Sequence, residues 1–190
     1  MIDFISDKRF KGLDFSKQRL PQASYEHCVF TDCNFANGYL DNQNFMECTF
    51  IECNLSNANI RHTQFNVVVF NNCKMMGLQF EEANNFLMNF TFNHCGLQLT
   101  SFIGLSLKKT HFLDCKLIEV DFTKADLTQS IFEKCDLQRA TFQDTIIEKV
   151  DFTSAYNFNI DPEINRLKNA VFTLKELPLL LKKYQLHIKN

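Results

Sequence analysis

Eight cysteines and five histidines are the side chains of this 190-residue sequence that could bind a metal ion or act as nucleophiles. Several cysteines lie five positions apart, as in Cys28 with Cys33 and Cys48 with Cys53. This is not the spacing of a zinc knuckle, and a buried cysteine behaves as a small apolar side chain. The spacing therefore favours thiols that pack inside a core over thiols that bind metal.

The histidines show no catalytic pattern either. The sequence carries them at positions His27, His62, His94, His111 and His187. Catalytic dyads and triads need side chains that converge, and the repeat described next turns the first four outward on different faces or heights. No glycine-rich phosphate loop is present. We predict a protein that is not an enzyme, with no catalytic residue, metal site or cofactor.

The elements that position these residues follow from a period of five. From Phe10 to Phe80, all fifteen residues at this spacing are large and apolar. The pattern fails at Asn85 and resumes two residues out of phase, from Leu87 to Phe152. A helix repeats every 3.6 residues and a strand every two, so neither produces this period. The sequence predicts one regular element repeated along the chain.

A second inward position lies two residues before each large residue and holds small side chains, including all eight cysteines. Units such as Ala125-Asp126-Leu127 and Cys135-Asp136-Leu137 resemble the pentapeptide-repeat family over about residues 8–156. The resemblance implies an all-β fold, a right-handed quadrilateral β-helix with four pentads in each coil. Rods of this kind lack a concave pocket, which agrees with a non-enzymatic role.

If each coil has four sides of five residues, like residues should recur every twenty positions. With the two-residue slip allowed, one side carries eight phenylalanines, from Phe10 to Phe152, and Phe172 extends this column. Another side carries a stack of six cysteines: Cys33, Cys53, Cys73, Cys95, Cys115 and Cys135. Both columns follow from one coil length, so we predict a filled core of stacked rings and thiols.

The ends of a solenoid need caps. We assign residues 1–8 to an N-terminal cap, 9–156 to the β-helix and 157–190 to a C-terminal cap or dimerisation tail. The spacing of Thr173 and Glu176 predicts a short helix, which Pro178 distorts, and residues 185–188 alternate like a strand. The tail either caps the last coil or joins two copies into a homodimer, in which case its apolar contacts are Leu174, Leu177, Leu180, Leu181 and Tyr184.

Charge and hydropathy limit the partners. The net charge is −2 and no apolar run reaches the about 20 residues of a membrane helix, so we expect neither nucleic-acid nor membrane binding. No signal peptide is visible, and eight cysteines without one indicate the reducing cytoplasm. The outer surface is acidic between residues 20 and 107, and the candidate partner surface consists of Glu26, Asp32, Asp41, Glu47, Glu52, Glu81 and Glu82.

The opening of the repeat, residues 10–35, resembles the quinolone-resistance branch of the family. That resemblance implies a dimeric acidic rod that mimics DNA and binds or protects DNA gyrase and topoisomerase IV. The branch carries a long projecting loop, whereas this sequence shows only the phase shift near residues 81–86, which is either a register correction or a partner-binding loop. The function we predict is a non-enzymatic protein-interaction rod that mimics DNA. The alternative is a structural scaffold with an unassigned protein partner.

Overall fold

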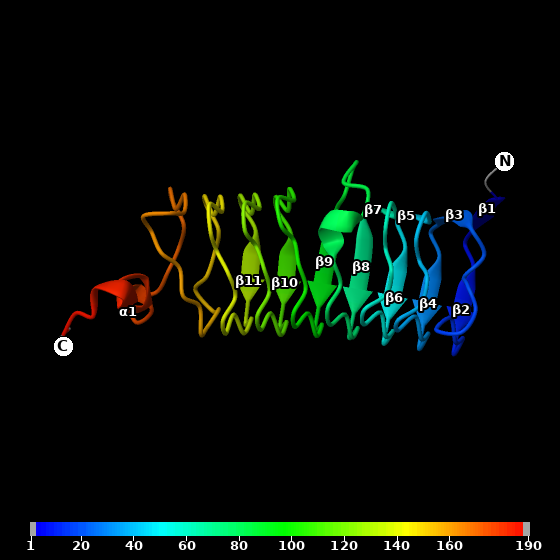
Figure 1. The fold of residues 1–190 in the computed structure, drawn as a ribbon, viewed down its shortest axis with the longest axis horizontal. Helices are drawn as coiled ribbons and strands as arrows, with labels where there is room; N and C mark the ends of the chain where they lie inside the picture. Colours follow the sequence, from blue (N-terminus) through cyan, green and yellow to red (C-terminus); the bar gives the residue numbers. More distant parts are fainter. Residues whose placement is uncertain (1–2, 188–190) are drawn as a thin grey trace.

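Short parallel strands build a straight rod in the computed structural model, which describes residues 3–187 (Figure 1). One side is a four-stranded sheet of β1 (Asp3–Ser6), β3 (Ala23–Glu26), β5 (Asn44–Met46) and β7 (Gln64–Asn66). A second side is a seven-stranded sheet of β2 (Arg9–Lys11), β4 (Val29–Thr31), β6 (Thr49–Ile51), β8 (Val68–Asn71), β9 (Phe90–Asn93), β10 (His111–Leu113) and β11 (Ile131–Glu133). Isolated parallel bridges, such as Asn34 with Asn54, join the coils on the remaining sides.

The register of these pairs confirms the predicted four-sided β-solenoid. Phe30 pairs with Phe50, twenty residues along the chain. The pair of Val68 with Phe90 is 22 residues apart, and the next coils return to a separation of twenty. The single two-residue slip therefore lies between β8 and β9, where the spacing of the apolar residues places it.

Nine stacked phenylalanine rings form one column of the core, from Phe10 to Phe172. Successive ring centroids lie 4.7 to 5.4 Å apart and the ring planes differ by 4° to 21°. These separations suit offset stacking, and they follow from the spacing of adjacent strands, about 4.8 Å. The column continues through the slip, because Phe70 stacks on Phe92 at 5.4 Å. The predicted ladder is present along the whole rod.

Most polar side chains at the second inward position donate to the same backbone group. Ser130 Oγ donates to the carbonyl oxygen of Leu107 at 2.7 Å, and Thr145 Oγ1 donates to that of Phe122 at 2.9 Å. The thiol of Cys53 makes the equivalent contact with Phe30 at 3.4 Å. In each case the acceptor lies 23 residues earlier, in the preceding coil. A buried polar group is costly unless it is hydrogen-bonded, so a donor that reaches this carbonyl is tolerated here, as are the amides of Gln43 and Asn165.

The turns at the corners of each coil restrict which residues lie between the inward positions. The corner residue, two positions after each large inward residue, adopts a positive φ of about 50° to 63° in most coils. Asparagine and aspartate tolerate this conformation best among residues with a Cβ, and Asn37, Asn42 and Asn57 lie at such corners. Just before the inward residue, an Asp or Asn carboxyl or amide oxygen accepts the N–H two residues on, as Asp121 does from Thr123 at 2.8 Å.

The two ends of the rod differ. Residues 3–6, assigned above to the N-terminal cap, form β1 and pair with β3 as a side of the first coil. At the other end lie α1 (Leu177–Leu180) and the 3₁₀ helix η2 (Lys182–Tyr184). The predicted helix start at Thr173 is wrong: α1 begins at Leu177 and has no side-chain cap. Pro178 lies within its first turn, where proline is well accommodated, so it does not distort the helix.

The predicted strand at residues 185–188 is absent from the part of the tail that the structure describes, because residues 185–187 form a turn and irregular chain. Ile188 lies outside the described residues. Over residues 3–187, none of the helices has the length and apolar character required to cross a membrane.

Candidate functional site

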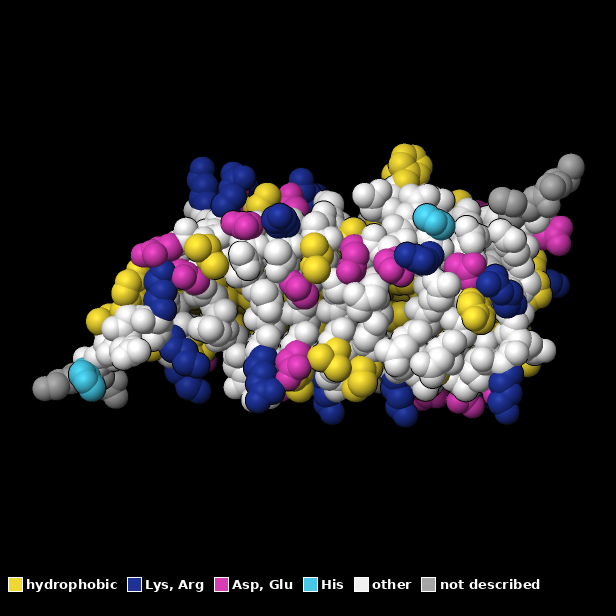
Figure 2. Space-filling view, viewed as in Figure 1, with side chains coloured by type: hydrophobic (Ala, Val, Ile, Leu, Met, Phe, Trp, Pro, Cys, Tyr) yellow, Lys and Arg dark blue, Asp and Glu magenta, His cyan; other side chains and the backbone are white. Residues whose placement is uncertain are grey.

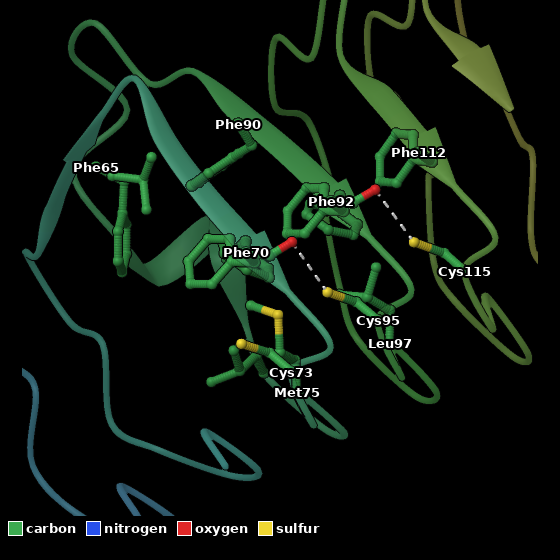
Figure 3. Close-up of a cluster of buried hydrophobic side chains, with 14 of the residues drawn as sticks. Phe65, Phe70, Cys73, Met75, Phe90, Phe92, Cys95, Leu97, Phe112 and Cys115 are labelled. Atoms are coloured by element: carbon green, nitrogen blue, oxygen red, sulfur yellow. Dashed lines mark hydrogen bonds between the residues drawn. The ribbon is translucent and has the colours of Figure 1, made fainter. Parts of the chain in front are cut away.

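The cysteine column is part of the core. All eight cysteines are free thiols and buried. Figure 3 shows Cys95 and Cys115 directed at the carbonyl oxygens of Phe70 and Phe92, at 3.4 and 3.5 Å. Burial raises the pKa of Cys48 to about 12. The Cys48 thiol therefore stays protonated at neutral pH and is a poor nucleophile and metal ligand. Within residues 3–187 no three His, Cys, Asp or Glu side chains form a metal-binding group.

The histidines lie outside the core, and three of them, His27, His94 and His111, lie beside a carboxylate. His94 Nδ1 is 3.0 Å from Asp114 Oδ2, and His111 Nε2 is 3.4 Å from Glu133 Oε2. His27 lies between two carboxylates, those of Glu26 and Glu47, at 3.6 and 3.5 Å. These pairs occupy separate parts of the rod and give no dyad with a thiol.

The seven acidic residues of the predicted partner surface do not form one stripe. Glu26 and Glu47 flank His27. Asp41 pairs with Arg19 at 3.2 Å, and Glu82 pairs with Arg61 at 3.6 Å. Figure 2 shows acidic and basic side chains interleaved along the visible face.

The remaining three acids differ in their surroundings. Glu81 accepts a hydrogen bond from Ser101 Oγ at 2.8 Å. Asp32 and Glu52 occupy corners of successive coils, both with positive φ, and among the described residues neither has a basic partner. These two carboxylates are the part of the predicted acidic surface that the structure brings together without neutralisation.

The phase shift produces a loop that projects from the rod (Figure 1). After the 3₁₀ helix η1 (Phe80–Glu82), the chain leaves the coil and returns at β9, and Figure 2 shows hydrophobic side chains protruding at this place. Phe86 and Leu87 are 64% and 58% exposed. The assignment of Leu87 to the core is therefore wrong. Phe90 takes the inward position instead. It is 2% exposed, and its ring centroid lies 5.6 Å from that of Phe65.

A strained residue lies at the base of the loop. Val67 has a φ of 53°, although a β-branched side chain is disfavoured in this conformation, and it is 50% exposed. The next residue, Val68, donates its N–H to the carbonyl oxygen of Asn89, where the loop ends, at 3.0 Å. Val67 is the corner residue of its coil, so the turn requires this φ, and the unusual feature is the exposed β-branched side chain there. Sequence reasoning missed this apolar cluster of Val67, Phe86 and Leu87, although the failure of the repeat at Asn85 marks its position.

The surface is also hollowed, contrary to the expectation that a rod lacks a pocket. The cavity, of about 530 Å³, lies on the cysteine side and includes Lys74, Gly96 and Lys116 in its lining. It is open to solvent. Its lining includes Cys73, Cys95 and His94, but the two thiols contact the carbonyl oxygens of Phe50 and Phe70.

The tail is fixed to the last coil by ionic contacts. Lys183 Nζ lies 2.7 Å from Asp161 Oδ1 and 2.6 Å from Glu163 Oε2, and Tyr184 Oη donates to Glu163. The Lys183 contacts lower the pKa of Asp161 and Glu163, and these carboxylates raise the pKa of Lys183. The carboxylates stabilise the docked tail above about pH 4, and this stabilisation is lost as the pH falls through their lowered pKa values. The lysine contribution is present below about pH 10 and is lost above it.

Most of the predicted dimerisation residues face solvent. Leu174 is 84% exposed, and Leu177, Leu181 and Tyr184 are exposed as well. Leu180 differs, because it packs against the core of the last coil and is only partly buried there. The tail thus both covers the end of the rod and leaves an apolar surface open.

The matches to known protein families lie within the repeat. The family model "Pentapeptide repeats (8 copies)" matches residues 28–66 and 48–84, and "Pentapeptide repeat region" matches residues 83–152. No curated protein matches the sequence.

Among solved structures, a trypsin-treated form of QnrB1, described as a plasmid-mediated fluoroquinolone resistance protein, is 18% identical with a TM-score of 0.49, covering 97% of this chain and 99% of its own. HetL, described as a pentapeptide repeat protein involved in heterocyst differentiation regulation in the cyanobacterium Nostoc, is 14% identical with a TM-score of 0.48, covering 87% and 86%.

Proposed function

Because this chain belongs to the pentapeptide-repeat family, a group of generally non-enzymatic proteins, we propose that it is a protein-binding rod whose partner is a type II topoisomerase, DNA gyrase or topoisomerase IV. The observation that carries the proposal is the apolar cluster of Val67, Phe86 and Leu87 at the one interruption of the repeat, where the chain projects from the rod (Figure 1). Exposed apolar side chains on a projecting loop are costly in water and gain free energy when a partner covers them.

The unpaired carboxylates of Asp32 and Glu52 give the proposal its second part, DNA mimicry. They lie one coil apart at the same corner, so their charges are spaced by about 4.8 Å along the rod. Duplex DNA carries one charge per about 1.7 Å of its axis. The rod therefore offers a sparser charge than DNA, and we assign most of the binding energy to the loop.

A scaffold with an unassigned partner is the second candidate function. The pairing of Asp41 with Arg19 and of Glu82 with Arg61 favours it, because these contacts neutralise acidic side chains that a DNA mimic would present. The same apolar cluster would then bind a protein other than a topoisomerase. For either partner we place the protein in the cytoplasm, where its eight free thiols would remain reduced.

A supercoiling assay separates the two functions. We expect the protein at about 10 µM to change gyrase activity, either by inhibiting supercoiling or by relieving its inhibition by a fluoroquinolone. The variant F86S/L87S should lose at least tenfold in potency, because it removes the apolar contacts of the loop. The variant should still fold, since both side chains are more than half exposed. The matched control is Leu99→Ser, another exposed leucine at 51%, which should behave as wild type. If the wild-type protein has no effect on gyrase or on topoisomerase IV, the topoisomerase function is excluded and the scaffold function remains.

We also infer that the open surface of the tail joins two copies of the chain. Leu174 and Leu177 are exposed apolar residues whose burial needs a second surface. The protein should sediment as a dimer at pH 7, and L174S/L177S should sediment as a monomer, while the control Ile131→Ser, 43% exposed on β11, stays dimeric. Below about pH 4 the tail loses its carboxylate contacts and the dimer should weaken. A wild-type monomer at 50 µM and pH 7 would contradict the inference.

A further inference from the structure

The cavity on the cysteine side owes its shape to one missing side chain. The row of outward residues there runs through consecutive bridges from Asn54 to Lys74, Gly96, Lys116 and Asp136. Gly96 is the member of this row without a side chain. Its backbone does not need glycine, since its φ is not positive. An added Cβ would meet only the amide oxygen of Gln98, at 3.0 Å, which is the mobile end of a side chain.

The charges around this hollow are arranged for an anion. Lys74 and Lys116 are bridged to Gly96 from the coils on either side, so they lie two coils apart, about 10 Å. Each ammonium is carried by a flexible four-carbon stem, which lets both reach the space above Gly96. Among the described residues neither lysine forms an ion pair, whereas Lys108 is paired with Asp126 at 3.1 Å.

The walls of the cavity cancel only part of this charge. On one side lies the pair of His94 and Asp114, whose carboxylate is engaged by the imidazole at 3.0 Å. The amide of Gln98, a neutral hydrogen-bonding group at the end of a flexible side chain, lies over Gly96, and Met76, which is 43% exposed, is a further part of the lining. The two lysines outnumber the single carboxylate of Asp114, so the lining carries a net positive charge.

We propose that the hollow above Gly96 binds one anionic group, a phosphate or a carboxylate, between the ammonium groups of Lys74 and Lys116. The group could belong to a free anion or to an acidic side chain of a partner protein, because both present the same oxygen acceptors to lysine. The site lies apart from the loop and does not depend on the topoisomerase proposal. Since each exposed contact contributes little, we expect half-saturation at about 1 to 10 mM for a free anion.

Nuclear magnetic resonance offers a reporter at the site itself, because the chain has only five glycines and their amide signals are readily separated. The ¹⁵N-labelled full chain is titrated with sodium phosphate at constant ionic strength and pH 7. The Gly96 amide should shift with a saturable curve. Gly12, Gly38 and Gly104, which do not line the cavity, should stay unchanged.

Two variants test the role of the lysines. Lys74→Gln and Lys116→Gln should each raise the half-saturation concentration at least threefold, while the control Lys124→Gln, an exposed lysine outside the cavity lining, should leave it unchanged. The spectrum of each variant also reports whether its fold is intact.

A second titration, with sodium acetate, distinguishes the source of the anion. A saturable shift with acetate supports a carboxylate, as on a partner's acidic side chain, and a shift with phosphate alone supports a phosphate ligand. A linear shift, an equal shift of all glycines, or wild-type affinity in both lysine variants would overturn the proposal.

Discussion

Replacement of Phe70 by aspartate is expected to prevent the rod from folding. The ring of Phe70 stacks on Phe50 at 5.2 Å and on Phe92 at 5.4 Å, and it is fully buried. Loss of a buried phenylalanine costs about 3 to 5 kcal/mol through lost contacts and the cavity that remains. An unpaired buried charge adds several kcal/mol, so the total approaches the whole stability of a typical domain.

Circular dichroism and a thermal melt measure this effect. The matched control is Val69→Asp, since Val69 lies next to Phe70 in β8 but on the outward side of the strand. That variant should lose no more than about 1 kcal/mol, the range of strand propensities. Equal melting temperatures for Phe70→Asp and Val69→Asp would show that the inward and outward positions are misassigned.

The second large effect is expected at Phe90, where alanine should destabilise the protein by about 3 to 5 kcal/mol. Phe90 occupies a second inward position, which holds small residues elsewhere, because the loop removes the large inward residue from this side of the coil. Its ring fills that space, and the ring centroids of Phe65 and Phe80 lie 5.6 and 5.1 Å from its own. Alanine would leave a void that neither neighbouring coil can close.

Chemical denaturation of Phe90→Ala against Phe86→Ala tests this assignment. Phe86 is 64% exposed, so its loss should change the free energy of unfolding by no more than about 0.5 kcal/mol. The two residues are four positions apart in the same interruption of the repeat. A larger loss for Phe86→Ala than for Phe90→Ala would mean that the loop, and not β9, supplies the core at this level.

The coil could be predicted from the sequence because each inward position restricts side-chain size. Phe30, Phe50 and Phe70 recur at twenty residues, and a ring at the wrong position would either face water or collide with the core. The interruption could not be resolved in the same way. Leu87 and Phe92 both fit the new phase, and only the path of the backbone shows that Leu87 leaves the core while Phe90 enters it.

The surface was less predictable, because its contacts join residues about twenty positions apart. Arg19 neutralises Asp41, and Arg61 neutralises Glu82, across neighbouring coils. A count of acids along the chain contains no such information. The hollow at Gly96 also needs three coils for its definition, since Lys74 and Lys116 flank it from above and below. Function at a solenoid surface is therefore set by columns, which follow from the register once it is known.

Equilibrium binding of the full chain to purified DNA gyrase, with and without competing duplex DNA, tests the proposed topoisomerase function most directly. The account predicts binding that duplex DNA weakens and that F86S/L87S reduces at least tenfold. Binding that duplex DNA leaves unchanged would contradict DNA mimicry. No binding to gyrase or topoisomerase IV at about 10 µM would contradict the topoisomerase function, although the rod, its ladder of rings and its projecting loop would remain.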